Sequence, residues 1–326
     1  PIPGAEEASV AIYLQEEEVA GLLDMPSVMA AVEAVMAAHA RGEVVDYPRQ
    51  RVRLPTSMTH MLQGAVPDKR LTGFKVYTSS GGRARFWVHV FDSDTGEPVA
   101  VLEADTLGMM RTGAAGGVAA KYLARPDAKI AAIVGAGWQA QGQALALAEA
   151  LPIETFRVAA RTPEHVRAFC ETMVQRTGRK FVPAESIEAA VRGADVVVTV
   201  TTSPKPVLEA DWLEEGVHVT AAGSNSLARQ ELPEKAVLRA DLICVDSREV
   251  ALREAGDLLP ALEKGRTRPG LWAELGEVIA GMRPGRRDGR QITLFESQGM
   301  AVQDLAVAAL VLERARERGL GRPLPY

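Results

Sequence analysis

The sequence predicts an α/β protein in which a Rossmann-type, doubly wound parallel sheet follows a β-rich α+β region. Two observations carry this prediction. Strand-like and helix-like segments alternate after residue 126, and a glycine-rich turn follows the first of these strands. Residues 50–104, by contrast, read as short strands separated by polar turns. A chain of 326 residues exceeds one typical domain, so we expect two.

The expected elements can be placed along the chain from apolar periodicity and turn residues. Residues 13–40 read as two helices, the second beginning near Asp24 and Pro26. Residues 105–123 read as a helix rich in small residues, which indicates close backbone packing. A Gly/Arg-rich loop at 281–290 is expected to be a solvated connection before a last strand and a final helix at 300–318. The expected strands are 51–54, 58–66, 71–78, 85–91, 98–103, 129–134, 156–160, 196–201, 218–222, 242–245 and 292–296.

The turn after the strand at 129–134 is typical of dinucleotide binding. Gly135 allows the sharp turn, Gly137 lets the backbone approach a pyrophosphate, and Ala140 takes the third small position. The N-terminus of the next helix, with Trp138 and Gln139, would then face the phosphates. A plain strand-to-helix turn is the alternative, but the strands on either side favour a nicotinamide dinucleotide.

The end of the following strand favours NADP(H) over NAD(H). An NAD site usually places an acid there for the ribose hydroxyl, whereas this chain reads Ala160-Arg161-Thr162. Arg161 could bind a 2′-phosphate through paired hydrogen bonds and Thr162 could add another. The alternative is that Arg161 is a solvated residue at the start of a helix.

Composition excludes several classes of partner. The net charge of −5 gives no reason to expect nucleic acid or an anionic membrane. No apolar run is long enough to span a bilayer, and the sequence as given shows no signal-like start. Cys170 and Cys244 lack metal-ligand spacing and are expected to be core thiols, so we expect no metal and a cytoplasmic location.

Three cations in the β-rich region could hold a carboxylate. Arg49, Lys75 and Arg111 lie among apolar or small residues. Together they would suit a 2-imino, 2-keto or 2-amino acid whose α-carbon faces a nicotinamide. Each could equally be an exposed charge or a structural ion pair.

Polar residues at the carboxyl ends of the predicted strands complete the candidate cofactor site, because open α/β sheets bind ligands there. Ordinary turn chemistry also favours Ser, Thr and Asn at such positions. The expected cofactor contacts are Thr112, Gly135, Gly137, Trp138, Gln139, Ala140, Arg161, Thr162, Thr201, Thr202, Ser203, Gly223, Ser224 and Gln298.

Several motifs, in this order, resemble the ornithine cyclodeaminase and mu-crystallin family over nearly the whole chain. The motifs are Leu107-Gly-Met-Met-Arg-Thr-Gly-Ala-Ala, Gly135-Ala-Gly-Trp-Gln-Ala, Thr199-Val-Thr-Thr-Ser, Ala222-Gly-Ser-Asn and Gln298-Gly-Met-Ala-Val-Gln-Asp-Leu-Ala. The resemblance implies a homodimer, a substrate and dimerisation domain of residues 1–122 with 298–326, and a Rossmann domain of residues 123–297. It also implies that Arg49, Lys75 and Arg111 bind the substrate carboxylate.

Departures from the resembled pattern favour reduction over ring closure. Asn225 stands where cyclodeaminases carry an Asp, His60 (or Met61, with a slip of one) where they carry a Glu, and Arg161 where they carry an Asp for NAD. We therefore expect an NAD(P)H-dependent oxidoreductase that reduces a small imino or keto acid, as a cyclic ketimine reductase or amino acid dehydrogenase does.

The proton in such a reaction could come from either of two residues. His60 could relay it, because a free histidine titrates near neutrality, or Lys75 could donate it. Asn225 would lie beside the reacting group. Two other functions remain open: cyclodeamination of ornithine or lysine with bound NAD, and non-catalytic binding of NADPH and a small ligand, as in mu-crystallin.

Overall fold

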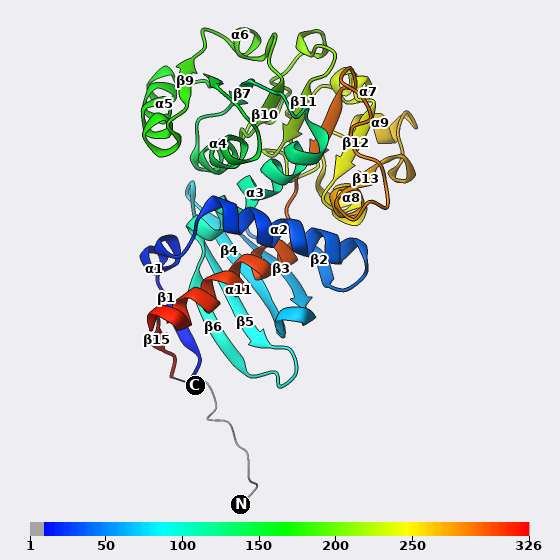
Figure 1. Ribbon diagram of the computed structural model, residues 1–326. Helices are drawn as coiled ribbons and strands as arrows, with labels where there is room; N and C mark the ends of the chain where they lie inside the picture. Colours follow the sequence, from blue (N-terminus) through cyan, green and yellow to red (C-terminus); the bar gives the residue numbers. More distant parts are fainter. Residues whose placement is uncertain (1–9, 326) are drawn as a thin grey trace, which may run out of the picture.

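The computed structural model describes residues 10–325 and contains two β-sheets, one in each half of the molecule (Figure 1). The sheet in the first half is mostly antiparallel and the sheet in the second half is parallel. This arrangement confirms the predicted α/β fold with a separate β-rich region. The exact residues at which one domain ends and the other begins stay a prediction.

The mostly antiparallel sheet has the strand order β15-β1-β6-β5-β4-β3-β2. Its central strands follow one another as hairpins, whereas β1 runs parallel to β6 and carries β15 at the edge. The strands are β1 Ile12–Leu14, β2 Val45–Arg53, β3 Ser57–Val66, β4 Leu71–Ser80, β5 Arg83–Asp92, β6 Pro98–Glu103 and β15 Arg322–Pro323. The short strands β1 and β15 were not predicted.

The two faces of this sheet differ in burial, because successive side chains of a strand point to opposite faces. Leu62, Lys75 and Val88 are buried on the face covered by the C-terminal helix α11 (Ala301–Arg318). Helix α2 (Met25–Ala40) packs against α11, and the short helix α1 (Glu16–Gly21) precedes it. The chain's last helix therefore packs onto its first sheet.

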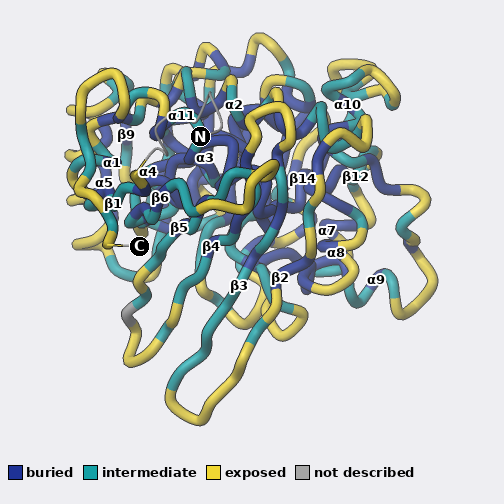
Figure 2. The backbone as a smooth tube through the Cα atoms, turned by 90° about the horizontal axis from the view of Figure 1, so that it is seen from below, coloured by how far each residue is buried: buried dark blue, intermediate teal, exposed yellow. Residues whose placement is uncertain are grey.

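Helix α3 (Asp105–Leu123) connects the two halves and is buried along most of its length (Figure 2). It begins and ends at the predicted residues. A Cβ atom added to Gly113 would lie 2.2 Å from the backbone of Gly142 in helix α4 (Trp138–Ala150). The small residues of α3 thus allow the close helix packing that the sequence indicated.

The parallel sheet has the strand order β13-β12-β14-β11-β10-β7-β8-β9. The chain leaves β7 toward β8 and β9 on one side and then returns to β10 on the other, so the strand order reverses between β7 and β10. Open α/β sheets bind ligands at such a switch point. The strands are β7 Ile130–Val134, β8 Thr155–Ala159, β9 Lys180–Pro183, β10 Val196–Thr199, β11 His218–Ala221, β12 Leu242–Val245, β13 Ala273–Glu274 and β14 Thr293–Glu296.

Both cysteines are buried. The helices between the strands of the parallel sheet are α5 Pro163–Thr177, α6 Ile187–Val191, α7 Glu234–Arg239, α8 Arg248–Glu254, α9 Leu259–Glu263 and α10 Leu275–Ile279, with 3-10 turns at Ala210–Trp212 and Pro269–Leu271. A further 3-10 turn, Pro67–Lys69, joins β3 to β4 of the first sheet. The loop at 281–290 is less solvated than expected. Arg286 is half-buried and donates to the carbonyl oxygens of Leu123 and Gln291, which ties the loop to the end of α3.

Candidate active site

A cleft of about 580 Å³ opens at the switch point of the parallel sheet. Its walls come from the residues that follow β7, β8 and β10, as expected for a dinucleotide site. Seven predicted cofactor residues line this dinucleotide cleft: Gly135, Gly137, Arg161, Thr162, Thr201, Thr202 and Ser203.

The glycine turn fits a pyrophosphate. Gly135 has φ +120°, a conformation that other residues rarely adopt, and an added Cβ would lie 2.6 Å from the carbonyl oxygen of Val200. Helix α4 begins after Gly137 with no side-chain cap. Its first N–H groups therefore remain available to a phosphate, which the positive end of the helix also favours.

A second pocket, of about 330 Å³, lies between the two sheets and is lined by all three predicted cations. Arg49 comes from β2, Lys75 from β4 and Arg111 from α3. We call this second pocket the cationic pocket. Five more predicted residues line the cationic pocket: Thr112, Trp138, Gln139, Asn225 and Gln298. Trp138 and Gln139 begin α4, and Gly137 just before them lines the dinucleotide cleft, so the start of α4 lies at both cavities.

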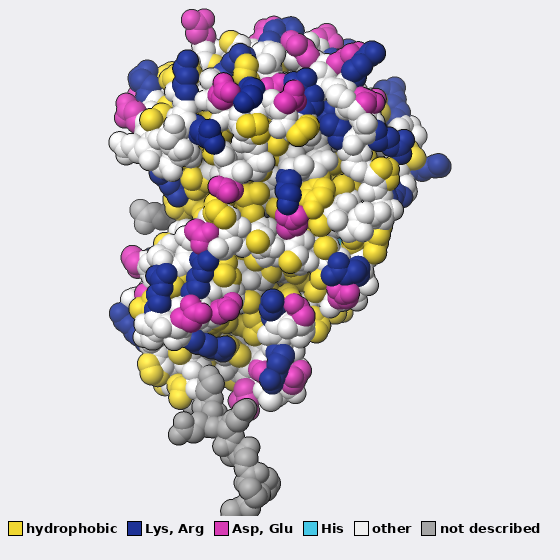
Figure 3. Space-filling view, in the orientation of Figure 1, with side chains coloured by type: hydrophobic (Ala, Val, Ile, Leu, Met, Phe, Trp, Pro, Cys, Tyr) yellow, Lys and Arg dark blue, Asp and Glu magenta, His cyan; other side chains and the backbone are white. Residues whose placement is uncertain are grey.

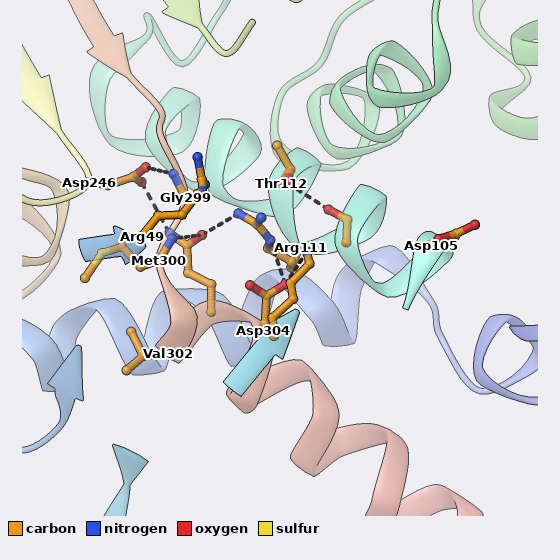
Figure 4. A network of polar contacts seen from close by, with 12 residues as sticks. Arg49, Asp105, Arg111, Thr112, Asp246, Gly299, Met300, Val302 and Asp304 are labelled. Atoms are coloured by element: carbon orange, nitrogen blue, oxygen red, sulfur yellow. Dashed lines mark hydrogen bonds and ion pairs between the residues drawn. The ribbon is translucent and has the colours of Figure 1, made fainter. Parts of the chain in front are cut away.

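One carboxylate oxygen binds two of the three cations. Oδ1 of Asp304, on helix α11, accepts from Nζ of Lys75 at 2.8 Å and from Nε of Arg111 at 3.0 Å. Arg111 and Asp304 extend toward each other from α3 and α11 (Figure 4), and Arg111 also donates to Oε1 of Gln303. All of these side chains are buried, so the ion pairs hold the two cations at fixed positions.

Arg49 is held by a different carboxylate. Its guanidinium donates to Oε2 of Glu254 at 2.8 Å and to the carbonyl oxygen of Gln298 at 2.8 Å. Arg51 pairs with the other oxygen of Glu254 at 3.0 Å and also donates to the carbonyl oxygen of Asn225. Glu254 therefore connects strand β2 to helix α8 of the other half.

The environment of Lys75 makes it able to exchange a proton near neutral pH. Burial lowers the pKa of Lys75 to about 8, although the charge of Asp304 opposes this shift. Its Nζ also lies 5.3 Å from the centre of the Phe86 ring. A buried ammonium with this pKa can both attract a carboxylate and release a proton.

Four predicted site residues do not line either cavity. Gly223 and Ser224 belong to the loop that follows β11, where Oγ of Ser224 donates to the carbonyl oxygen of Arg229. Ala140 is buried inside α4. His60 lies beside Tyr77 on the neighbouring strand and stacks on it at 4.2 Å between ring centres.

The pKa of His60 also differs from the near-neutral value expected from sequence. Burial lowers the pKa of His60 to about 4, and the positive charges of Arg49, Arg51 and Arg53 add to this effect. The imidazole is therefore neutral at pH 7 and has no proton in reserve for a relay.

Sequence reasoning missed Asp304, Glu254, Tyr77 and Phe86 as parts of the site. Asp304 closes the Gly-x-Ala-x-x-Asp segment at residues 299–304, so that motif was the available signal. Glu254, Tyr77 and Phe86 are single residues without a motif, and only the fold brings them to the cationic pocket.

A larger cavity, of about 890 Å³, is lined mainly by α2 and α11 and contains none of the predicted site residues. On the face seen in Figure 3, Lys and Arg side chains alternate with Asp and Glu rather than forming one basic patch. Within residues 10–325, no group of three or more His, Cys, Asp or Glu side chains is arranged to hold a metal ion. No helix in the same range has the length and apolar character needed to cross a membrane.

The fold and the site together define a nicotinamide dinucleotide-binding oxidoreductase with a cationic pocket beside the dinucleotide cleft. A model of the ornithine cyclodeaminase/mu-crystallin family matches residues 9–319, and the chain belongs to that family. The sequence is 41% identical over 240 residues to Delta(1)-pyrroline-2-carboxylate reductase of Bacillus cereus, a match covering 73% of this chain and 74% of the relative.

Two solved structures have the same fold over nearly the whole chain. Delta(1)-pyrroline-2-carboxylate reductase of Thermococcus litoralis, in complex with NADH and L-proline, matches with a TM-score of 0.92 and 32% identity, covering 96% of this chain and 100% of that one. An archaeal alanine dehydrogenase dimer with bound NAD matches with a TM-score of 0.91 and 32% identity, covering 97% of this chain and 99% of that one.

Replacing Asp304 tests its role as the shared counter-ion. We expect Asp304→Asn to lower the free energy of unfolding by about 3–5 kcal/mol, because it leaves two buried cations without their carboxylate. Urea denaturation at pH 7 measures the change, with the exposed Asp68→Asn as a control that leaves stability unchanged. Equal stability of the two variants would contradict the role given to Asp304.

Proposed function

We propose that the protein reduces a small 2-imino acid with NAD(P)H, as a cyclic ketimine reductase or an amino acid dehydrogenase does. The observation that carries this proposal is the convergence of Arg49, Lys75 and Arg111 on one pocket beside the dinucleotide turn. A carboxylate bound there would place its α-carbon next to the start of α4. The names of the matched reductases and of the alanine dehydrogenase support the same chemistry.

The cations would orient the substrate. The guanidinium of Arg111 and the ammonium of Lys75 keep N–H donors beyond those given to Asp304, and these can bind the substrate carboxylate. When bound, the reduced dinucleotide supplies a hydride to the imine carbon. The C=N double bond becomes a single bond, and the nitrogen takes up one proton to give the amino acid.

Lys75 is the proton donor in this proposal. Its pKa of about 8 leaves it mostly protonated at pH 7, whereas His60 is neutral there and does not line the cationic pocket. Lys75 would thus bind the carboxylate and donate a proton to the substrate nitrogen. Solvent would reprotonate Lys75 after each turnover.

The pocket walls favour a compact, apolar substrate side chain. Tyr77 and Phe86 form one wall and Trp138 another. Asp105 is an acid among the lining residues, but Asn225 offers an amide rather than a second acid for the second amine of a diamino acid. These walls suit a five- or six-membered cyclic imine better than a diamino acid. Cyclodeamination of ornithine is therefore the second candidate rather than the first.

An assay with a substrate panel tests the function. Purified protein, given NADPH or NADH with cyclic and linear imino acids, should consume the reduced nicotinamide, and Arg111→Ala should abolish turnover while still binding dinucleotide. If no imine is reduced, the reductase proposal fails. Proline and ammonia formed from ornithine, without net change in nicotinamide, would establish cyclodeamination instead, and ligand binding without turnover would indicate a binding protein.

The pH dependence tests the role of Lys75. Protonated Lys75 is the active form, so kcat/KM should fall as the pH rises through about 8. In Lys75→Arg the side chain stays charged, so this alkaline decrease should disappear and the rate should be lower. An unchanged decrease near pH 8 in Lys75→Arg would assign the titration to another group.

We also propose NADP(H) as the preferred cofactor. Arg161 lines the dinucleotide cleft at the end of β8, is exposed, and forms no ion pair with any residue in the described range. Thr162 is the residue before α5 and its hydroxyl caps no N–H group. Both side chains are therefore available to a 2′-phosphate, although the two matched structures hold NADH and NAD.

A charge reversal at Arg161 measures this preference. We expect Arg161→Asp to weaken NADPH binding by about 100-fold and NADH binding far less, because only NADPH carries the 2′-phosphate that the guanidinium would bind. Nicotinamide fluorescence gives both dissociation constants, and Arg167→Asp, on the exposed part of α5, serves as the control. Equal weakening of both cofactors would refute the NADP(H) assignment.

A homodimer in the cytoplasm is part of the same proposal. The face of the first sheet that α11 leaves uncovered carries half-buried Phe74, His89 and Phe91, and Phe74 stacks on His89 at 4.8 Å. An aromatic face of this kind suits a second copy of the chain, and one matched structure is described as a dimer. Sedimentation at the mass of one chain would contradict this assembly.

A further inference from the structure

The buried carboxylate of Glu231 lies outside both cavities and joins a loop of the dinucleotide cleft to a loop of the cationic pocket. Glu231 lies in the loop between β11 and α7 and is 0% exposed. Its Oε1 accepts from the backbone N–H of Thr201 at 2.6 Å, and its Oε2 accepts from the backbone N–H of Gly223 at 2.8 Å. No part of the proposed reaction uses Glu231.

The two N–H groups belong to neighbouring strands at the point where the strands separate. Strands β10 and β11 run parallel, and the last backbone hydrogen bond between them joins Ala222 N–H to the carbonyl oxygen of Thr199. Beyond that bond the strands diverge, and the side chain of Glu231 fills the gap. Without it, both N–H groups would be buried without hydrogen-bond partners, which is unfavourable.

The loops joined in this way have different tasks. Thr201 and the two residues after it line the dinucleotide cleft. Ala222 and Asn225, on either side of Gly223, line the cationic pocket. The distance between these loops therefore determines how the two cavities face each other.

Contacts with neighbouring residues fix the position of Glu231. A Cβ atom on Gly223 would lie 2.3 Å from the carbonyl oxygen of Thr201 and 2.6 Å from Cδ of Glu231, so glycine lets the two loops approach with the carboxylate between them. On the other side, Oδ1 of Asp257 accepts from the N–H of Glu231 at 2.6 Å, and the carbonyl oxygen of Glu231 accepts from Val207 N–H at 2.8 Å. The residue is thus bonded at its side chain, its N–H and its carbonyl.

We propose that Glu231 is a positioning residue that sets the spacing of the β10 and β11 loops, so that a dinucleotide bound in the cleft extends correctly into the cationic pocket. This inference rests on the proposed function for its effect on catalysis. Its effect on dinucleotide binding is separate, because the β10 loop lines the dinucleotide cleft whatever the second substrate is.

The isosteric variant Glu231→Gln tests the proposal. A glutamine can accept from one N–H, but its amide nitrogen then faces the other N–H as a second donor. We expect the dissociation constant for NADPH, measured by nicotinamide fluorescence, to rise at least tenfold, and kcat with the best imino acid to fall at least tenfold. Glu234→Gln, three residues along and paired with Lys264 and Arg266 at the surface, should change neither value.

A second variant tests the same contact with the charge kept. Glu231→Asp retains the carboxylate but shortens its reach by one methylene, so it cannot accept from both N–H groups and should give the same two changes; it carries the test if Glu231→Gln fails to fold. Folded variants with normal NADPH affinity and kcat, but a lower unfolding temperature, would show a purely structural role and overturn the proposal. A wild-type protein that binds NADPH but reduces no imine would refute the proposed function and leave the binding test of Glu231 intact.

Discussion

The site depends on one carboxylate oxygen that two cations share. Oδ1 of Asp304 binds Lys75 and Arg111 together, and these three residues come from α11, β4 and α3. Two buried cations near each other would repel strongly without a counter-charge. Asp304 makes their proximity stable, and in doing so it fixes the C-terminal helix against both the first sheet and the connecting helix. The ion pairs that position the predicted carboxylate site therefore also stabilise the fold.

The same principle applies to the opposite side of the pocket. Glu254 holds Arg49 and Arg51 and ties β2 to α8, as Asp304 ties α11 to α3. Each carboxylate leaves part of the donor capacity of its cations unused, because an ammonium has three N–H groups and a guanidinium has five. A cationic pocket built in this way can be stable when empty and still bind an anion. The cations are positioned before the substrate arrives, so little ordering is needed on binding.

The sequence predicted those features that depend on local chemistry. Helix α3 begins and ends where its small residues and flanking signals placed it, and the turn at Gly135 lies at the predicted strand end. It could not predict the partners of the cations, because Asp304 is 229 residues from Lys75 and 193 from Arg111. The lowered pKa of His60 could not be predicted from the sequence either, because burial and the charges of residues on another strand determine it. Short strands such as β1 carry too few residues for a periodic pattern.

Lys75 and Arg111, held by Asp304, are proposed to bind the carboxylate of an amino or imino acid beside the nicotinamide. A crystal structure of the protein with NADP⁺ and L-proline would show where that carboxylate lies. We expect the proline carboxylate within hydrogen-bond distance of Nζ of Lys75 and of the guanidinium of Arg111, with the α-carbon facing the nicotinamide ring and Asp304 still bound to both cations. A carboxylate bound elsewhere, or a proline whose α-carbon faces away from the nicotinamide, would contradict this proposal.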